Sequence, residues 1–248
     1  PPRSAAREPA GRRLALFFAA YFALVGILAP YMPLYFEHRG LTAVQIGLLV
    51  AMAQAMRMVG PNLWGWLADR SGHRTRILRV TSIALAASFA LLFLPGGFGF
   101  VFGAMALVNF FQTAQMPVAE ALASAQLRGQ PDAATRYGRL RVMGSLAFVA
   151  VVLASGPLFD RVGMQAALWV CIGLALLLLA ASARVVEQHA VELPHERVSV
   201  RARLREPRVR WFFASAALMV FAHGALYTYL SLYLAQLGYS KTAIGAFW

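Results

Sequence analysis

The stretch G-W-L-A-D-R-S-G-H-R-T-R, from Gly65 to Arg76, places one acid, three arginines, a histidine and two glycines within twelve residues. On both sides of it lie long apolar segments that are unsuited to water. A short, charged, glycine-containing stretch between two such segments is typical of a turn that joins two membrane helices. The stretch therefore indicates a helical membrane protein.

The composition of the whole chain agrees with this interpretation. Hydrophobic residues make up 60% of the 248 residues and charged residues 13%, whereas soluble domains have about 25% charged residues. Seven apolar stretches approach or exceed the length of about 20 residues that a membrane-spanning helix needs. They cover residues 14–36, 44–68, 77–95, 98–125, 142–159, 164–183 and 211–235. Because these stretches are continuous and do not alternate with period two, we expect an all-α membrane protein and no barrel.

The net charge of +13 reports on topology. Nineteen of the 23 lysines and arginines lie at one set of alternate connections, and only Arg39, Arg161 and Lys241 lie at the other. Basic loops stay in the cytoplasm, so we expect a multi-pass protein of the bacterial inner membrane with a cytoplasmic N-terminus. This placement excludes nucleic acid as the partner.

Several classes of site are absent from the sequence. The single cysteine, Cys171, lies in an apolar stretch, which rules out an intrachain disulfide and a thiolate metal cluster. No phosphate-binding loop, zinc-ligand spacing or Ser-His-Asp set occurs at credible positions. We therefore expect no cofactor, no metal and no enzyme, and any transport would be driven by a gradient.

The seventh apolar stretch repeats the first. At a constant offset of 198 residues, eight of 22 aligned positions are identical, four of them Gly or Tyr pairs before residue 41. The pairs are Gly26/Gly224, Leu28/Leu226, Tyr31/Tyr229, Leu34/Leu232, Tyr35/Tyr233, Gly40/Gly238, Ile46/Ile244 and Gly47/Gly245. We expect a six-helix half (1–183), a basic cytoplasmic linker (184–210) and the start of a second half (211–248), so that the chain is truncated after its seventh helix. The alternative is a genuine seven-helix protein.

Four ionisable residues lie within or at the edge of the apolar stretches: Arg57, Glu120, Arg141 and His223. Such groups are costly in lipid and usually face a partner or a cavity. Glu120 and Arg141 flank one turn, so they can pair, either to bind a polar ligand or to lock two helices together. Arg57 has no acid nearby on its own stretch and is either an anion partner or a snorkelling side chain. His223 is either a proton-coupling group or a packing residue.

Polar amides also occur inside the stretches. They lie at Gln54, Asn62, Asn109, Gln112 and Gln115. Either they line a cavity or they form hydrogen bonds between helices.

The opening stretch resembles the loop between the second and third helices of major facilitator superfamily transporters. The residues that match are Gly65, Leu67, Ala68, Asp69, Arg70, Gly72 and Arg74. The resemblance implies a gating role for Gly65, Asp69, Arg70, Gly72 and Arg74, with Asp69 docking the two halves; simple solvation of the loop is the alternative. Because the dipole at a helix C-terminus disfavours an acid, Asp69 needs a partner such as Arg74 or a helix N-terminus.

Two further motifs, P-x-x-E ending at Glu120 and G-R-x-R-x-x-G around Arg141, resemble the oligosaccharide–proton symporters (lactose permease-like carriers). This resemblance implies that Glu120 and Arg141 bind substrate and that Phe148 stacks against it.

The segments 57–70, 137–145 and 223–234 resemble the 3-phenylpropionate transporter group. That resemblance implies proton-coupled uptake of a small organic acid, such as an aromatic carboxylate, by alternating access. Arg57 would then bind the acid. We expect a monomer whose partners are a small molecule, a proton and the lipid bilayer. A sugar or nucleoside symporter, or a truncated membrane protein that transports nothing, is the alternative.

Overall fold

The structure is a computed structural model that describes residues 8–187 and 205–248. Arg3, Arg7 and the middle of the expected linker lie outside the described residues. The described residues form helices joined by short turns, without strands. The helices are α1 (Glu8–Leu28), α2 (Met32–His38), α3 (Ala43–Ser71), α4 (Arg74–Leu91), α5 (Phe98–Leu127), α6 (Ala133–Val162), α7 (Ala166–Arg184), α9 (Pro207–Gln236) and α10 (Lys241–Phe247).

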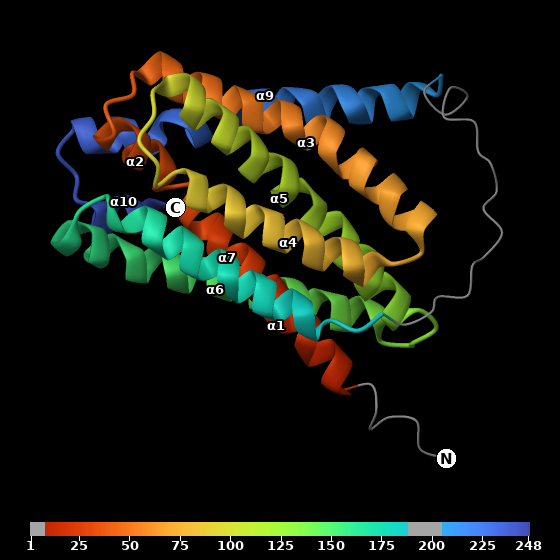
Figure 1. Ribbon diagram of the computed structural model, residues 1–248. Helices are drawn as coiled ribbons and strands as arrows, with labels where there is room; N and C mark the ends of the chain where they lie inside the picture. Colours follow the sequence, from red (N-terminus) through yellow and green to blue (C-terminus); the bar gives the residue numbers. More distant parts are fainter. Residues whose placement is uncertain (1–7, 188–204) are drawn as a thin grey trace.

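The helices form a bundle in which α1 packs against α6 and α7, while α5 packs against α3 and α4 (Figure 1). Large side chains of α1, among them Phe17, Phe18 and Leu24, are fully buried. We call the end that carries the loop at Gly72 and the N-terminus of α1 the basic end. The other end, which holds the turns at Gly40, Gly163 and Gly238, is the opposite end. Helix α9 contacts α2 more than it contacts α3 or α10.

Two boundaries differ from the sequence prediction. The first expected span, 14–36, breaks into α1 and α2 around Pro30, because proline lacks an N–H and disfavours helical backbone in the residue before it. Helix α6 begins at Ala133, so Arg141 lies about two turns inside the helix and does not open it.

Five of the described helices are long and apolar enough to cross a membrane: α1, α3, α6, α7 and α9. The sequence prediction had seven spans, and α4 and α5 occupy the other two places. Three arginines lie within the first six residues of α4. Helix α5 carries Asn109, Gln112 and Gln115, and all three are buried. These three polar side chains therefore face the interior of the structure.

The repeated sequence adopts repeated geometry at the opposite end. Gly40 and Gly238 both have left-handed backbone, with φ of 85° and 84°, which glycine adopts without steric cost. Two residues after each glycine, Thr42 and Ser240 accept a hydrogen bond from the backbone N–H three residues on and so cap the next helix.

One repeated pair of tyrosines, Tyr31 and Tyr229, also makes matching contacts. A Cβ atom on Gly245 would overlap the hydroxyl of Tyr31, and one on Gly47 would overlap the hydroxyl of Tyr229. Each tyrosine therefore packs against a glycine of the other repeat, and both contacts lie at the opposite end.

Candidate functional site

A cavity of about 580 Å³ is lined by residues of α1, α2, α3, α5 and α6 and by Tyr227 and Trp248. Most of its wall is apolar and comes from α1, α2 and α3. Four aromatic side chains line it: Phe36, Phe148, Tyr227 and Trp248. A cavity of this size with apolar walls and a few polar groups is typical of a small-molecule site.

Arg57 is the charged residue that lines this cavity. It extends from the middle of α3, and its Nη1 lies 3.5 Å from Oε1 of Gln54, one turn away. Among the residues that the structure describes, no carboxylate lies within ion-pair distance of Arg57. The cavity therefore contains a positive charge that the described residues leave uncompensated.

Glu120 and Arg141 form an ion pair, with 3.3 Å between Oε1 and Nη1. Tyr137, one turn before Arg141 on α6, donates a second hydrogen bond of 3.0 Å to the same carboxylate oxygen. The two side chains of the ion pair are 40% and 45% exposed. Glu120 thus accepts from both partners through Oε1.

The ion pair is not part of the cavity wall. Phe148 lines the cavity from α6, and Arg141 lies seven residues earlier, which is about 10 Å closer to the basic end. The guanidinium of Arg141 lies 5.2 Å from the ring centre of Phe22 on α1. A Cβ atom on Gly144 would overlap Phe22, so this glycine makes room for the ring that Arg141 covers.

The expected site residues therefore fall into two groups. Arg57 and Phe148 line the cavity, and Glu120 and Arg141 pair nearer the basic end. Sequence reasoning missed Tyr137 and Phe22. The contact of Tyr137 could have been predicted from the sequence, because a residue one turn before Arg141 lies on the same helix face. The contact of Phe22 could not, because Phe22 is more than 100 residues away from Arg141 in the sequence.

The five amide residues of the apolar stretches were expected either to line a cavity or to form hydrogen bonds between helices. Gln54, Asn109 and Gln112 line the cavity. Gln115 instead joins α4 to α5: its Nε2 donates to Thr81 Oγ1 (2.9 Å), and its Oε1 accepts from Ser82 Oγ (3.1 Å). Asn62 is exposed and bonds to its own helix through the carbonyl of Met58. Gln115 therefore serves helix packing, whereas Asn62 neither lines the cavity nor joins two helices.

At the basic end, the loop between α3 and α4 turns at Gly72, whose φ of 64° is left-handed. Arg74 Nη2 donates to Asp69 Oδ1 at 2.9 Å, so Arg74 supplies the positive partner that Asp69 requires. A Cβ atom built on Gly65 would meet open space, so no other helix of the described part of the chain approaches this glycine closely. In the turn before α6, the hydrogen bond from Arg136 lowers the pKa of Asp132.

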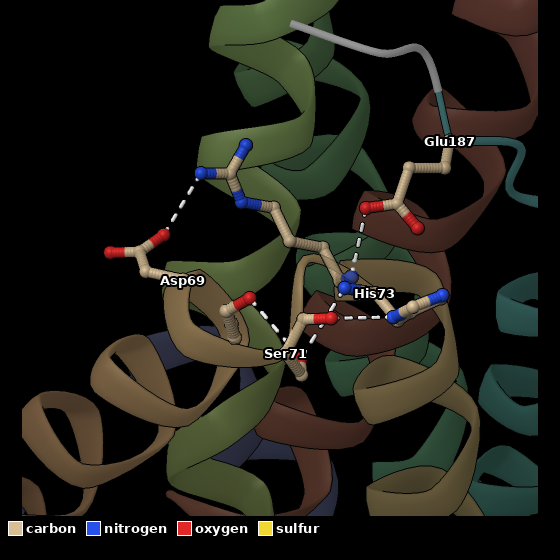
Figure 2. Close-up of polar contacts among 6 residues, drawn as sticks. Asp69, Ser71, His73 and Glu187 are labelled. Carbon is tan, nitrogen blue, oxygen red and sulfur yellow. Dashed lines mark hydrogen bonds and ion pairs between the residues drawn. The ribbon is translucent and has the colours of Figure 1, made fainter. Parts of the chain in front are cut away.

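Glu187, which follows α7, caps the start of α4 (Figure 2). Its Oε1 accepts from the backbone N–H of Arg74 at 2.8 Å, and its Oε2 accepts from the Thr75 hydroxyl at 2.9 Å. A carboxylate is favoured at a helix N-terminus by the backbone N–H groups and the dipole. The segment that follows α7 is thus bonded to the start of α4, just after the turn that separates α4 from Asp69. This contact joins residues 113 apart, so sequence reasoning did not find it.

His223 on α9 is exposed and does not line the cavity. Its Nδ1 donates to the carbonyl of Met219 at 2.8 Å, and its ring stacks on Tyr227 with centres 5.9 Å apart. His223 thus supports an aromatic residue of the cavity wall.

Comparison with known proteins adds to this geometry. Residues 12–248 match the family described as "MFS_1 like family". The chain is 30% identical over 244 residues to a "Probable 3-phenylpropionic acid transporter" of Escherichia coli (strain K12). The aligned region covers 96% of this chain and 62% of the relative. The chain is 29% identical over 234 residues to a "Maltose permease" of Geobacillus stearothermophilus, which covers 93% of this chain and 58% of that protein. The chain thus spans about three fifths of the length of these relatives.

Proposed function

Because this chain belongs to the MFS_1 like family of the major facilitator superfamily, we propose that it is part of a proton-coupled carrier for a small organic acid. The preferred substrate is an aromatic carboxylate such as 3-phenylpropionate. The carrier works by alternating access in the bacterial inner membrane as a monomer, without enzymatic activity, and its basic end is cytoplasmic. Residues 1–183 form one half, 184–210 the linker and 211–248 the start of the other half.

The observation that carries the proposal is the charge of Arg57 within an aromatic cavity. A cation without an acidic partner attracts an anion, and burial of the bound anion strengthens the attraction. Phe36 and Phe148 line the same cavity and supply apolar surface for a ring. One positive group beside apolar walls fits a molecule with one carboxylate and a hydrophobic body.

The pair of Glu120 and Arg141 has a different role in this proposal. Because Glu120 already neutralises Arg141, the pair offers no net charge to an anion. It can exchange partners when a proton or a substrate arrives, since one carboxylate oxygen accepts both present bonds. We assign the pair to polar substrate contact and coupling, with His223 as a further candidate for the proton.

The motif of Gly65, Asp69, Arg70, Gly72 and Arg74, which covers the end of α3, the turn at Gly72 and the start of α4, is assigned to gating. The ion pair of Asp69 and Arg74 is largely open to water on the Asp69 side, so Asp69 can change partner at small cost. Glu187 bonds to the backbone of Arg74. The proposed gating motif is therefore connected to the segment that follows α7.

A sugar or nucleoside symporter is the second candidate. The amides Gln54, Asn109 and Gln112 in the cavity can bond to hydroxyl groups, and one relative is named a maltose permease. A sugar carrier would not need the uncompensated charge of Arg57, which is why we place the organic acid first.

Uptake into proteoliposomes tests the proposal. Radiolabelled 3-phenylpropionate and maltose are compared with and without an imposed pH gradient, acidic outside. We expect gradient-dependent accumulation of the carboxylate. Accumulation of maltose alone would favour the second candidate, and no accumulation of any substrate would favour a membrane protein that does not transport.

A further inference from the structure

Asp160, in the last turn of α6, bonds to the start of α10 at the opposite end. Its Oδ1 accepts from the backbone N–H of Lys241 at 2.9 Å, and its Oδ2 accepts from the N–H of Thr242 at 2.9 Å. The Thr242 hydroxyl donates a third bond of 2.6 Å to Oδ2. Hydrogen bonds to a carboxylate are about twice as strong as neutral ones, so this one side chain holds two segments that are 81 residues apart.

The surrounding residues make the joint between α6 and α10 close. A Cβ atom on Gly156 would come within 2.7 Å of the Cα of Thr242. The hydroxyl of Tyr31 donates to the carbonyl of Val152 at 2.8 Å and lies 3.4 Å from that of Lys241. Tyr31 thus reaches both sides of the joint. Glycine at position 156 is required for this approach, because any side chain there would push α10 away.

The contact between α6 and α10 lies between the cavity and the opposite end. Helix α6 carries Phe148 and α10 leads into Trp248, and both line the cavity, whereas Asp160 and Thr242 lie further toward the opposite end. Asp160 and Thr242 are exposed, so water can replace their bonds if the joint opens. The contact is therefore specific in geometry and reversible.

We propose that Asp160 is the latch of an outer gate. It holds α10 against α6 and closes the cavity toward the opposite end, and it must release Lys241 and Thr242 each time the cavity opens there. The inference rests on the alternating access proposed above, but it assigns the closing contact on the side away from the loop with Asp69.

A labelling experiment tests the latch without substrate. Cys171 is replaced by alanine, and the cavity residue Ala29 by cysteine, in the membrane-embedded carrier. A membrane-impermeant maleimide is then added from the side of the opposite end. We expect Asp160→Ala to raise the labelling rate of Cys at position 29 by about tenfold or more, since a charge-assisted bond holds the closed state, and Thr242→Val to raise it less.

The matched control is Asp132→Ala, which removes an exposed, hydrogen-bonded carboxylate just before the other end of α6. This variant is expected to label at the parent rate. An unchanged rate in Asp160→Ala, or an equal increase in Asp132→Ala, would overturn the latch.

A cross-link gives a second, independent test. The double variant Asp160→Cys and Thr242→Cys, when oxidised, is expected to block both labelling at position 29 and uptake, and a reducing agent should restore both. Full uptake by the oxidised protein would show that the joint need not open, which overturns the proposal. If the parent protein transports nothing, the proposed function fails, while the labelling rates still decide the latch.

Discussion

Arg57 and Arg141 are both exposed, but of the two only Arg141 has a carboxylate partner among the described residues. Arg141 is neutralised by Glu120, whereas Arg57 contacts the amide of Gln54. The two arginines therefore differ in their ability to bind an anionic ligand. Arg57 can bind an anion directly, and Arg141 can do so only if its bond to Glu120 is weakened.

Replacing Arg57 by glutamine should weaken binding of an aromatic carboxylate about 10- to 100-fold, because a hydrogen bond to a charged group contributes about 1.5–3 kcal/mol. Arg57→Lys should retain part of the affinity, since the charge remains while the planar fork is lost. Ligand-induced thermal shift and uptake both measure the effect. Arg208→Gln, at an exposed arginine of α9, is the control, and equal affinity of Arg57→Gln and the parent would contradict the assignment.

Glu120→Gln and Arg141→Lys should each abolish uptake while leaving membrane insertion intact. Both side chains are partly exposed, so their loss should change the free energy of unfolding by less than about 1 kcal/mol. Transport assays and a comparison of melting temperatures separate the two effects. Normal uptake by both variants would mean that the pair has no part in transport.

Gln112 and Gln115 lie one turn apart on α5 and should respond differently to replacement by alanine. Gln115→Ala removes two buried hydrogen bonds to hydroxyls of α4, which should lower stability by about 1–3 kcal/mol, since each such bond contributes about 0.5–1.5 kcal/mol. Substrate affinity should be retained. Gln112→Ala changes the cavity wall and should alter substrate affinity with little effect on stability. A loss of affinity in Gln115→Ala alone would contradict the division of these amides between cavity and helix packing.

Gly72→Ala should destabilise the turn between α3 and α4, because left-handed backbone costs a residue with a Cβ about 1–2 kcal/mol. Gly173→Ala is the matched control: it lies inside α7, with no other described atom near its Cβ position, and alanine favours a helix there by up to about 1 kcal/mol. The melting temperature should therefore fall in the first variant and hold or rise in the second. The reverse order would show that the loop does not turn at Gly72.

Much of the architecture followed from local sequence. Continuous apolar stretches predicted helices in the right order, and Gly72 marked a turn, because both signals depend on residues close together in the chain. The first span was predicted as one helix, although Pro30 already carried the signal for a break. The repeat at an offset of 198 residues was visible in sequence, but that Tyr31 and Tyr229 each face a glycine of the other repeat was not.

By itself, the sequence determined that this chain is an all-helical membrane protein, because apolar length is a property of a linear segment. The major facilitator type followed from the resemblance of its motifs to that family and from the family match. The sequence also placed Glu120 and Arg141 on neighbouring helices, since one short turn joins those helices. Only the tertiary structure decided which polar residues face the cavity and which serve packing, as for Gln112 and Gln115. The contacts of Asp160 with Thr242 and of Glu187 with Arg74 depend on how distant helices cross, and helix crossing is fixed by packing of the whole bundle.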